Sequence, residues 1–475
     1  MTQSFDLVVI GSGPGGYVAA LKAAQLGASV AIVEQHPFFG GTCLNWGCIP
    51  SKAILATAEL AHRIHHAKNL GISVQGDVAV DWAHVQKRKD KVLAKLRGGI
   101  KSLLNARKVT SFQGRGHLDG AGRVVVTGPD GAAKETLTAR GIILAVGSVP
   151  ARLPGWPDDP DFICTSDEAL HWKELPKKVL IVGGGVIGCE FACMLQPLGV
   201  EVTIVEILPK LLAGLDGSLA DAMAAAFKSR GVAVHLGVKV EDVSIIGDGV
   251  TARLDNGKTL QVDRVLVATG RRPATTQIGL ESAGISPTKR GFIPVRDTME
   301  TDAKGVYCIG DANGRCLLAH AASAHGVVAA ENILGANNAF HAPIPSCVYT
   351  FPEIAAVGLT QEQAREQGIP ISIGTFPLAA LGKAMAVNET DGFAKVLRHR
   401  ETDELLGVHM VGHNVTEAIA AAGAMLHQKA TVTDVAETVF AHPTISEGIK
   451  EAAEDALGAG LHLPPRKLIR IEAGA

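Results

Sequence analysis

The chain has 475 residues and a formal net charge of −2, and its sequence is 47% hydrophobic and 19% charged. This length predicts about three or four domains, the composition excludes an intrinsically disordered chain, and the charge balance does not favour a nucleic-acid partner. The first residues lack the features of a signal peptide, and no apolar run reaches the roughly 20 residues that span a bilayer, so we expect a cytoplasmic protein without a membrane segment.

The first predicted unit has the order of a dinucleotide-binding fold. An apolar strand over 5–10 leads into a glycine-rich turn, an Ala-rich helix over 17–26 follows, and a second strand over 29–33 ends at Glu34. The first glycine permits the tight turn, the second lets the backbone approach a pyrophosphate, and the third lets helix and strand pack closely. The acid would bind a ribose. The glycines are Gly11, Gly13 and Gly16.

Two cysteines, Cys43 and Cys48, follow a Gly-Gly pair and precede Pro50. On a regular α-helix their Cα atoms would be about 8.6 Å apart, beyond the roughly 7 Å that a disulfide spans. A bridge therefore requires a distorted backbone, which Gly47 permits. A helix opening near Pro50 would lower the pKa of the Cys48 thiol. The spacing is not a common zinc pattern, so no metal is expected. The alternative is two unconnected buried cysteines, which is what we expect of most of the other six.

The same plan recurs later in the chain. A strand over 178–182 precedes a second glycine-rich turn, a helix runs to Gly199, and a strand over 202–205 ends at Glu206. Because a carboxylate there would repel a 2′-phosphate, this unit is expected to prefer NAD over NADP. Two unrelated turns are the alternative, and the repeated strand, helix and acid oppose it. The glycines of this copy are Gly183, Gly185 and Gly188.

Each unit closes with an apolar strand and a glycine turn, at 144–148 and 267–273. A later strand over 305–309 ends in Gly310-Asp311, where the carboxylate could face a flavin ribityl chain or a phosphate-bridging water, although Gly-Asp alone is an ordinary turn. From about 347 onward, mixed strands and Ala-rich helices predict a separate α+β domain without a nucleotide motif.

A histidine and an acid form the second candidate constellation. Glu447 lies five residues after His442, close enough to hold the imidazole tautomer and support its cation. A structural or exposed histidine is the alternative. Spacing alone does not decide whether this pair meets the cysteines within one subunit or across a dimer.

At this point the sequence resembles a known family, the FAD-containing pyridine nucleotide–disulfide oxidoreductases. Residues 40–52, GGTCLNWGCIPSK, resemble its redox-active segment, and 442–447, HPTISE, resemble its C-terminal signature. The resemblance extends from Phe5 to about Gly458. It implies an α/β fold with two Rossmann-like domains and a C-terminal α+β dimerisation domain. The implied divisions are an FAD domain over 1–148, an NAD domain over 149–275, a central domain over 276–346 that completes the FAD site, and a dimerisation domain over 347–475.

Within the family, Cys-Leu-Asn, Ile-Pro-Ser-Lys and Glu206 resemble the branch that oxidises dihydrolipoamide with NAD+. The resemblance implies a homodimer in which Cys43 exchanges with the substrate, Cys48 is the charge-transfer thiol beside the flavin, and His442 of the other subunit is the base, supported by Glu447. Electrons would pass to FAD and then as hydride to NAD+. The lipoyl arm would come in trans from a 2-oxoacid dehydrogenase complex or the glycine cleavage system.

The resemblance also implies cofactor contacts beyond the two glycine motifs. For FAD these are Glu34, Gly41, Thr42, Lys52, Gly116, Gly147, Asp311, Leu318, Ala319 and His320. For NAD they are Glu190, which would pair with Lys52, and Glu206, Val240 and Gly270. The chain departs from the family pattern at Val146 and at Ser323-Ala324-His325, both expected near the flavin.

Two alternatives stay open from the sequence. One is another NAD(P)H-dependent disulfide or metal-ion reductase on the same scaffold, although mercuric reductases usually add a C-terminal cysteine pair and the last cysteine here is Cys347. The other is a redox-silent assembly subunit, which the retained thiols and His442 oppose. The tail after about 460 allows no interpretation.

Overall fold

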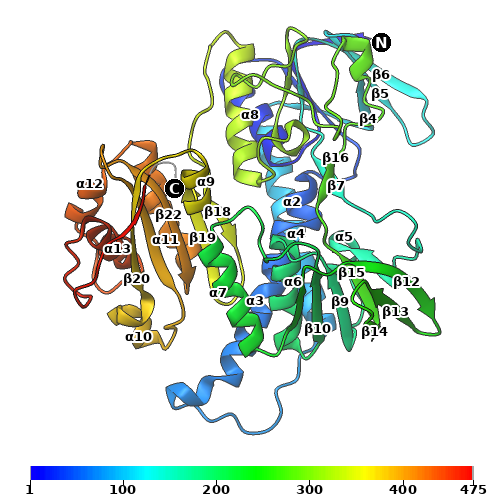
Figure 1. The fold of residues 1–475 in the computed structure, drawn as a ribbon. Helices are drawn as coiled ribbons and strands as arrows, with labels where there is room; N and C mark the ends of the chain where they lie inside the picture. The colour runs from blue at the N-terminus through cyan, green and yellow to red at the C-terminus, as the bar shows by residue number, and fades with distance from the viewer. Residues whose placement is uncertain (1, 473–475) are drawn as a thin grey trace.

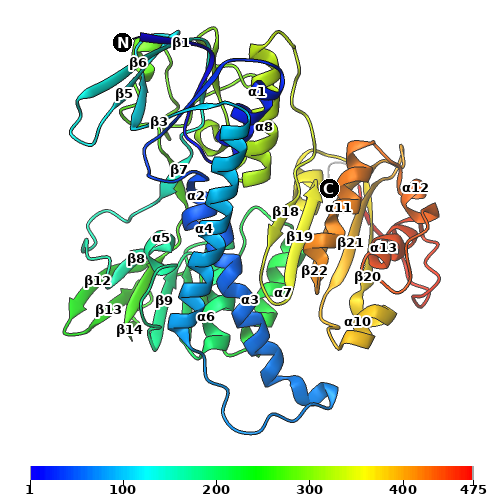
Figure 2. The same cartoon turned by 180° about the vertical axis from the view of Figure 1, so that it is seen from behind.

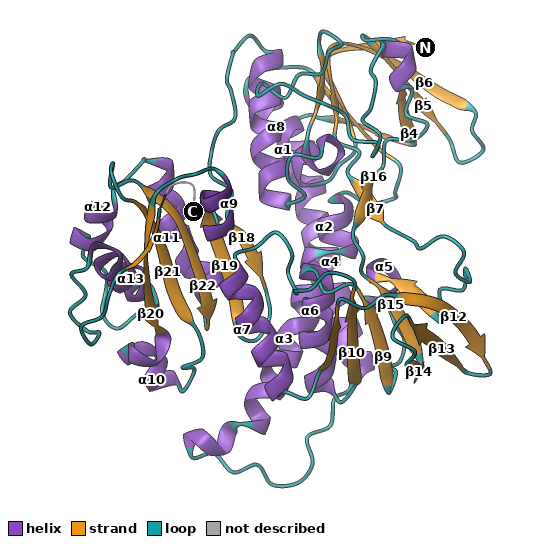
Figure 3. Ribbon diagram, in the orientation of Figure 1, coloured by secondary structure: helices purple, strands orange, loops and turns teal. Residues whose placement is uncertain are grey.

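The computed structural model describes residues 2–472. It shows two units of sheets and helices, one above the other, and a third unit at their side (Figure 1). Figure 3 shows helices beside the main sheet of each of the three units. The parallel strand pairs of the first two units and the antiparallel third sheet confirm the predicted α/β class with a C-terminal α+β part.

The first unit is built on a seven-stranded sheet of order β3-β2-β1-β6-β5-β4, with β17 paired to β6. Its central pairs are parallel, whereas β4, β5 and β6 pair antiparallel. Because β17 pairs with β6, the chain returns to this sheet after the second unit and brings Asp311 to its edge. Helices α1 and α8 pack side by side on it (Figures 1 and 2). The elements are β1 (Thr2–Ile10), α1 (Pro14–Gln25), β2 (Val30–Glu34), β3 (Thr110–Gln113), β4 (Arg115–Leu118), β5 (Arg123–Thr127), β6 (Ala133–Leu144), β17 (Val306–Cys308), η4 (Gly310–Asn313) and α8 (Ala319–Ile333), with η3 (Leu280–Ala283) in the returning segment.

Three helices connect the first unit to the second. A short helix carries Cys43, a long one begins at Cys48, and a third runs antiparallel back along it (Figure 2). The helices are α2 (Gly41–Trp46), α3 (Cys48–His65) and α4 (Trp82–Ala106), with η1 (Ala67–Leu70) between the last two.

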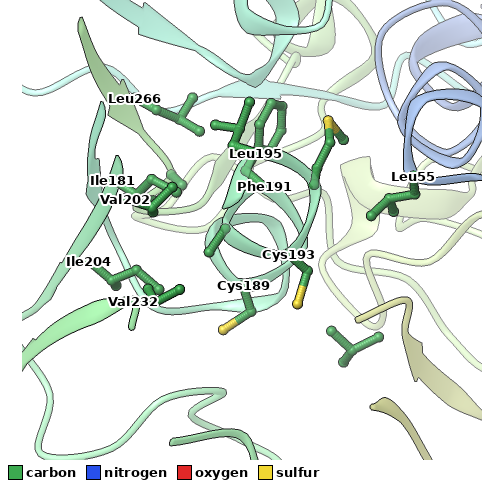
Figure 4. Close-up of a cluster of buried hydrophobic side chains, with 14 of the residues drawn as sticks. Leu55, Ile181, Cys189, Phe191, Cys193, Leu195, Val202, Ile204, Val232 and Leu266 are labelled. Atoms are coloured by element: carbon green, nitrogen blue, oxygen red, sulfur yellow. The ribbon is translucent and has the colours of Figure 1, made fainter. Parts of the chain in front are cut away.

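The second unit has a parallel sheet of order β11-β10-β9-β15-β8 beside a three-stranded antiparallel sheet. The ribbon of β7 and β16 joins it to the first unit. Helix α6 packs its apolar residues between this sheet and α3, so that Cys189 and Cys193 lie in the core with Phe191 and Leu55 (Figure 4). The elements are β7 (Ser148–Pro150), β8 (Ile163–Thr165), α5 (Ser166–Ala169), β9 (Lys178–Val182), α6 (Val186–Leu195), η2 (Gln196–Leu198), β10 (Glu201–Glu206), α7 (Gly217–Ser229), β11 (Ala233–Leu236), β12 (Val240–Ile246), β13 (Gly249–Leu254), β14 (Thr259–Val262), β15 (Arg264–Val267) and β16 (Arg271–Pro273).

The third unit has an antiparallel sheet of order β18-β19-β22-β21-β20-β23, with helices against it. The tail forms the edge strand β23, and Arg466 donates to the buried Asp455 on α13. The tail is therefore part of this unit. The elements are β18 (Ser346–Val348), β19 (Glu353–Gly358), α9 (Gln361–Glu366), β20 (Ile371–Pro377), η5 (Leu378–Ala380), α10 (Gly382–Val387), β21 (Phe393–His399), β22 (Leu405–Gly412), α11 (Val415–His427), α12 (Val432–Glu437), α13 (Glu447–Leu457) and β23 (Ile469–Ile471).

No helix of the described residues is long and apolar enough to cross a membrane. Across the same part of the chain, no group of three or more His, Cys, Asp or Glu side chains is arranged to hold a metal ion. The cysteines are all unpaired; Cys164, Cys189, Cys193 and Cys308 are buried, and Cys43, Cys48, Cys316 and Cys347 are half-buried.

Candidate active site

The segment that carries the cysteines begins with a turn that only glycines can make. Gly40 and Gly41 have φ values of +106° and +55°, in the left-handed region that L side chains avoid. A Cβ on Gly41 would also lie 2.5 Å from the Cα of Gly13. The start of α2 therefore packs directly against the first glycine motif, and the cysteines lie close to this turn.

The helix breaks between the two cysteines. Gly47, at φ −142° and ψ −114°, separates α2 from α3, and Cys48 is the first residue of α3. This is the distortion that the spacing required. At a helix start, free backbone N–H groups and the helix dipole favour a thiolate.

The two thiols differ in acidity. The hydrogen bond with Cys43 and, to a smaller extent, the charge of Lys52 lower the pKa of Cys48 to about 7, despite its burial. The same hydrogen bond, together with burial, raises the pKa of Cys43 well above its usual range. Of the two thiols in the reduced pair, Cys48 is therefore the one that ionises first.

Lys52 and Glu190 form the predicted ion pair. Lys52 Nζ lies 2.8 Å from Glu190 Oε2, which joins α3 to α6. Glu190 Oε1 also accepts from the backbone N–H of Tyr349 at 3.0 Å, and Lys52 Nζ lies 4.3 Å from the centre of the Tyr349 ring. Burial raises the pKa of Tyr349 to about 12, so its phenol stays neutral.

The first glycine motif forms a tight turn between β1 and α1, which we call the first cradle. Gly11 has φ +100°, and a Cβ on Gly16 would clash with the Gly11 carbonyl, so the helix packs tightly on the strand. Glu34 is buried and accepts from Ser12 N at 3.0 Å and Ser12 Oγ at 2.5 Å. A cavity of about 370 Å³ opens beside Glu34 and is also lined by Phe38. A cradle followed by an acid and a cavity suits an adenosine diphosphate group.

The second glycine motif repeats this geometry between β9 and α6 and forms the second cradle. Gly183 has φ +112°, and Gly185 faces open space where a Cβ would meet nothing, which leaves room for a pyrophosphate. Glu206 Oε2 accepts from Gly184 N at 2.6 Å, and Oε1 accepts from Leu208 N at 2.8 Å. These backbone bonds hold the carboxylate at the end of β10, beside the turn.

Asp311 joins the two units. Its Oδ2 accepts from Ser148 Oγ at 2.5 Å, and Ser148 Oγ accepts from Arg271 Nε at 2.7 Å. Leu318 is the N-cap of α8, and the exposed His320 next to it contacts the carbonyl of Pro345 through Nε2 at 2.8 Å. The Asp311 carboxylate thus lies at the junction of the two units, and the start of α8 contacts the segment that leads into β18.

The remaining predicted cofactor residues lie in the same two units. The structure places Thr42 in α2, Gly116 in β4, Gly147 in the turn before β7, Ala319 at the start of α8, Val240 at the start of β12 and Gly270 before β16. The departures have packing roles: Ser323 Oγ donates to Pro14 O at 3.3 Å, and Val146 packs on the core of the first sheet. His325 is buried against Phe340.

The histidine–acid pair is formed as its spacing suggested. His442 Nδ1 lies 2.8 Å from Glu447 Oε1, and Thr444 N donates to Glu447 Oε2 at 2.8 Å. Although burial opposes it, these bonds lower the pKa of Glu447. The pair lies at the start of α13. In both views, the third sheet lies between α13 and the helices α2 and α3 (Figures 1 and 2). The side chain of His442 is 74% exposed. Within one chain, the pair is not brought to the cysteines.

Sequence reasoning missed several residues around the thiols. Tyr17, at the start of α1, has its pKa raised by burial and by Cys43. Tyr349 lies under Lys52, and Arg97 of α4 donates to Asn45. The only local signal was that Asn45 lies between the cysteines; the other residues are far from them in the chain.

The chain matches two family models. "Pyridine nucleotide-disulphide oxidoreductase" covers residues 5–326, and the dimerisation domain of the same group covers 344–453. It is 41% identical to a dihydrolipoyl dehydrogenase of Chlamydia muridarum over 98% of this chain and 100% of that protein. It is 39% identical to one of Bacillus subtilis over 97% and 100%.

Solved structures agree with this likeness. LpdA of Mycobacterium tuberculosis is similar with a TM-score of 0.88 at 28% identity, covering 95% of this chain and 99% of that one. The Cu(II) complex of the HOCl-induced flavoprotein disulfide reductase RclA of Escherichia coli is similar with a TM-score of 0.85 at 28% identity, with the same coverage.

Proposed function

Because the chain belongs to the pyridine nucleotide-disulphide oxidoreductase family, we propose that it oxidises dihydrolipoamide at a site formed by Cys43 and Cys48 of one subunit and His442 of a second. It is an enzyme of the dihydrolipoyl dehydrogenase type, which uses FAD and reduces NAD+ to NADH. The observation that carries the residue assignment is the helix break at Gly47, which puts Cys48 at the start of α3, where the helix dipole favours a thiolate. The lowered pKa of Cys48 and the raised pKa of Cys43 agree with it.

The residues present fit both cofactors. The first cradle, with Glu34 and its adjoining cavity, would hold the adenosine end of FAD, and the second cradle, with Glu206, would hold NAD. When bound, FAD would supply a two-electron acceptor for the dithiol and a hydride donor for NAD+. Asp311, at the junction of the two units, and the start of α8 would hold the rest of the flavin.

The difference in acidity assigns the thiol roles. His442 accepts a proton from a thiol of dihydrolipoamide, and the resulting thiolate attacks the Cys43 sulfur. A new S–S bond forms there, the Cys43–Cys48 bond breaks, and its electron pair goes to the Cys48 sulfur. The thiol of lower pKa leaves faster, which suits Cys48. The second substrate thiol then displaces Cys43, which takes up a proton, and lipoamide is released.

The base is proposed to come from the partner subunit. Two observations support this: His442 lies across the third sheet from α2 in its own chain, and the dimerisation family model covers it. Glu447 holds the imidazole through Nδ1, which leaves Nε2 for the substrate.

The chain divisions follow from the same assignment. We assign 1–148 to an FAD domain, 149–275 to an NAD domain, 276–346 to a central domain and 347–475 to a dimerisation domain. The pairing of β17 with β6 supports a central domain that completes the first unit.

The partner and the location are proposed as follows. The lipoyl arm would come from a 2-oxoacid dehydrogenase complex or the glycine cleavage system. A cytoplasmic location is supported by the six cysteines outside the Cys43–Cys48 pair, which are all unpaired, since free thiols persist in reducing compartments.

Hybrid dimers test the composite site. A dimer of one Cys48→Ser subunit and one His442→Gln subunit retains a single intact site if the base acts across the interface, because the native thiol pair then faces the native histidine. We expect about half of the wild-type turnover of dihydrolipoamide. If the base acts within its own chain, both sites are damaged and the hybrid matches the two parent variants.

A substrate panel tests the reaction itself. Purified enzyme is assayed with dihydrolipoamide, glutathione disulfide and mercuric ion, each with NAD(H) and NADP(H). We expect turnover of dihydrolipoamide with NAD+ to dominate. Dominant reduction of glutathione disulfide or mercuric ion would favour the alternative reductases, and no turnover of dihydrolipoamide in the FAD-loaded dimer would favour a redox-silent subunit.

A further inference from the structure

A fully buried amide lies between the two cysteines. Asn45 is 0% exposed, and its Nδ2 donates to Gly41 O at 2.8 Å and to Phe39 O at 3.2 Å. These bonds close the glycine turn that leads into α2. The side chain of Asn45 therefore fixes the path of the backbone on which Cys43 is carried.

The side-chain oxygen of Asn45 accepts a hydrogen bond from a residue of α4. Arg97 Nε, which is 52 positions away on α4, donates to Asn45 Oδ1 at 2.5 Å. The Arg97 guanidinium also lies 4.0 Å from the centre of the Phe38 ring, and Phe38 packs on Trp46 with ring centroids 5.7 Å apart. Arg97 thus packs on Phe38, just before the Gly40-Gly41 turn. Phe38 in turn packs on Trp46, the residue before Gly47.

Arg97 lacks an acid partner within residues 2–472, because no carboxylate there forms a salt bridge with it. Burial lowers the pKa of Arg97, and Asp90 is the charge that opposes this shift. A hydrogen bond from a charged donor to a neutral amide is stronger than one between neutral groups, particularly away from water.

We propose that Arg97 is a positioning residue which, through Asn45, holds the Cys43–Cys48 turn in the shape in which the two sulfurs meet. This rests on the proposed role of the pair as the redox centre. When the segment holds the Cys43 and Cys48 sulfurs close together, the effective concentration of one thiol at the other is higher. The disulfide is then more stable relative to the dithiol. Loosening the turn shifts the pair toward the dithiol.

A second contact of Arg97 has to be separated from this role. Arg97 also lines the cavity beside Glu34, so its loss could act through the cofactor instead of the redox turn. The two routes differ in what they change: one alters FAD content, and the other alters the thiol–disulfide equilibrium at full FAD content.

The test compares Arg97→Met, which keeps an aliphatic chain over Phe38 but has no donor, with Arg97→Lys, which keeps a charge and a donor. Lys95→Met, at an exposed position on the same helix, is the control for loss of a cation. FAD-loaded homodimers are equilibrated with dithiothreitol at several ratios of its reduced and oxidised forms. The thiols are then trapped by alkylation, and the Cys43–Cys48 peptide is quantified by mass spectrometry.

For Arg97→Met we expect a roughly tenfold shift toward the dithiol, which is about 30 mV for a two-electron couple, with unchanged FAD content. Arg97→Lys should recover part of the shift, and Lys95→Met should match wild type. An unshifted Arg97→Met at full FAD content overturns the inference, as does a shift seen only in proportion to lost FAD. If Arg97→Met does not fold, the comparison of Arg97→Lys with wild type decides, and equality overturns the inference. Wild-type protein that never forms the Cys43–Cys48 disulfide would overturn the proposed function itself.

Discussion

Lys52 Nζ lies between the two oxygens of Glu190, at 2.9 Å from Oε1 and 2.8 Å from Oε2, and so joins α3, which begins at Cys48, to α6 of the second unit. The pair has opposite effects on Cys48: the charge of Lys52 lowers the pKa of this thiol, and the charge of Glu190 raises it. The acidity of the thiol therefore depends on a contact between two separate units.

Substitutions of this pair should shift the Cys48 pKa in opposite directions. We expect Lys52→Met to raise it above about 7, and Glu190→Gln to lower it. Each shift should be on the order of one pH unit, because a charge within a few ångströms changes a pKa by about that much. The measurement is the pH midpoint of the long-wavelength charge-transfer absorbance in two-electron-reduced enzyme. Midpoints that move in the same direction would show that the two charges do not act separately on Cys48.

Removing one sulfur at a time separates the thiol roles. Cys48→Ser should keep bound FAD and lose the charge-transfer band on two-electron reduction, because the thiolate that interacts with the flavin is absent. Cys43→Ser should keep the band, since Cys48 remains able to ionise. FAD content and visible spectra of both variants provide the measurement. A band that persists in Cys48→Ser would reverse the two roles.

The carboxylate at the end of β10 should determine cofactor preference. We expect Glu206→Ala to weaken NAD+ binding about tenfold, in line with the loss of one or two hydrogen bonds, and to weaken NADP+ binding less, because the repulsion of a 2′-phosphate disappears. Dissociation constants for both nucleotides are measured by titration. The exposed Glu201 on the same strand gives the control Glu201→Ala, which should leave both constants unchanged. Equal losses for NAD+ and NADP+ would show that Glu206 does not read the ribose.

Loss of the base should affect only the thiol half of the reaction. His442→Gln should lower kcat for dihydrolipoamide by roughly 10²- to 10⁴-fold, the range of general acid–base catalysis. Oxidation of NADH by ferricyanide, which bypasses the dithiol, should continue. The exposed His427 at the end of α11 supplies the control His427→Gln. An equal fall in both activities would indicate damage to the fold or the flavin site.

A buried ion pair joins the second unit to the third. Lys395 Nζ lies 2.7 Å from Asp216 Oδ1, and both side chains are almost completely buried. Lys395→Met leaves the carboxylate without its cation, so we expect the free energy of unfolding to fall by about 3 kcal/mol or more. Denaturant unfolding of this variant, with Lys95→Met as a surface control, measures the change, and a loss as small as that of the control would contradict it.

The same pair predicts acid sensitivity. Although burial opposes it, the pKa of Asp216 is lowered by His409, Lys395 and Ser218 from its ordinary value of 3.8. A carboxyl with a lower pKa in the folded state contributes stability that is complete above 3.8 and is lost as the pH falls below it. In wild type this contribution should decline below about pH 4. Asp216→Asn should weaken this decline, measured as stability against pH.

The sequence by itself determined the parts of this protein that depend on neighbours along the chain. The glycines of both cradles, the acids Glu34 and Glu206, and the helix break at Gly47 follow from backbone conformation and strand–helix order, which short segments specify. The His442–Glu447 pair lies within six residues, so its contact was also predictable from spacing.

Only the tertiary structure decided which distant residues meet around the thiols. Residue spacing gave no sign that Arg97 would reach Asn45, that Tyr349 would lie beside Lys52, or that the tail would add the edge strand β23. The Lys52–Glu190 contact was expected from family resemblance and not from spacing. Such contacts depend on how separately folded elements pack, and no local pattern encodes that packing. The packing of the third unit also separates His442 from the thiols of its own chain. In the proposed dimer, a second subunit would bring a histidine to them.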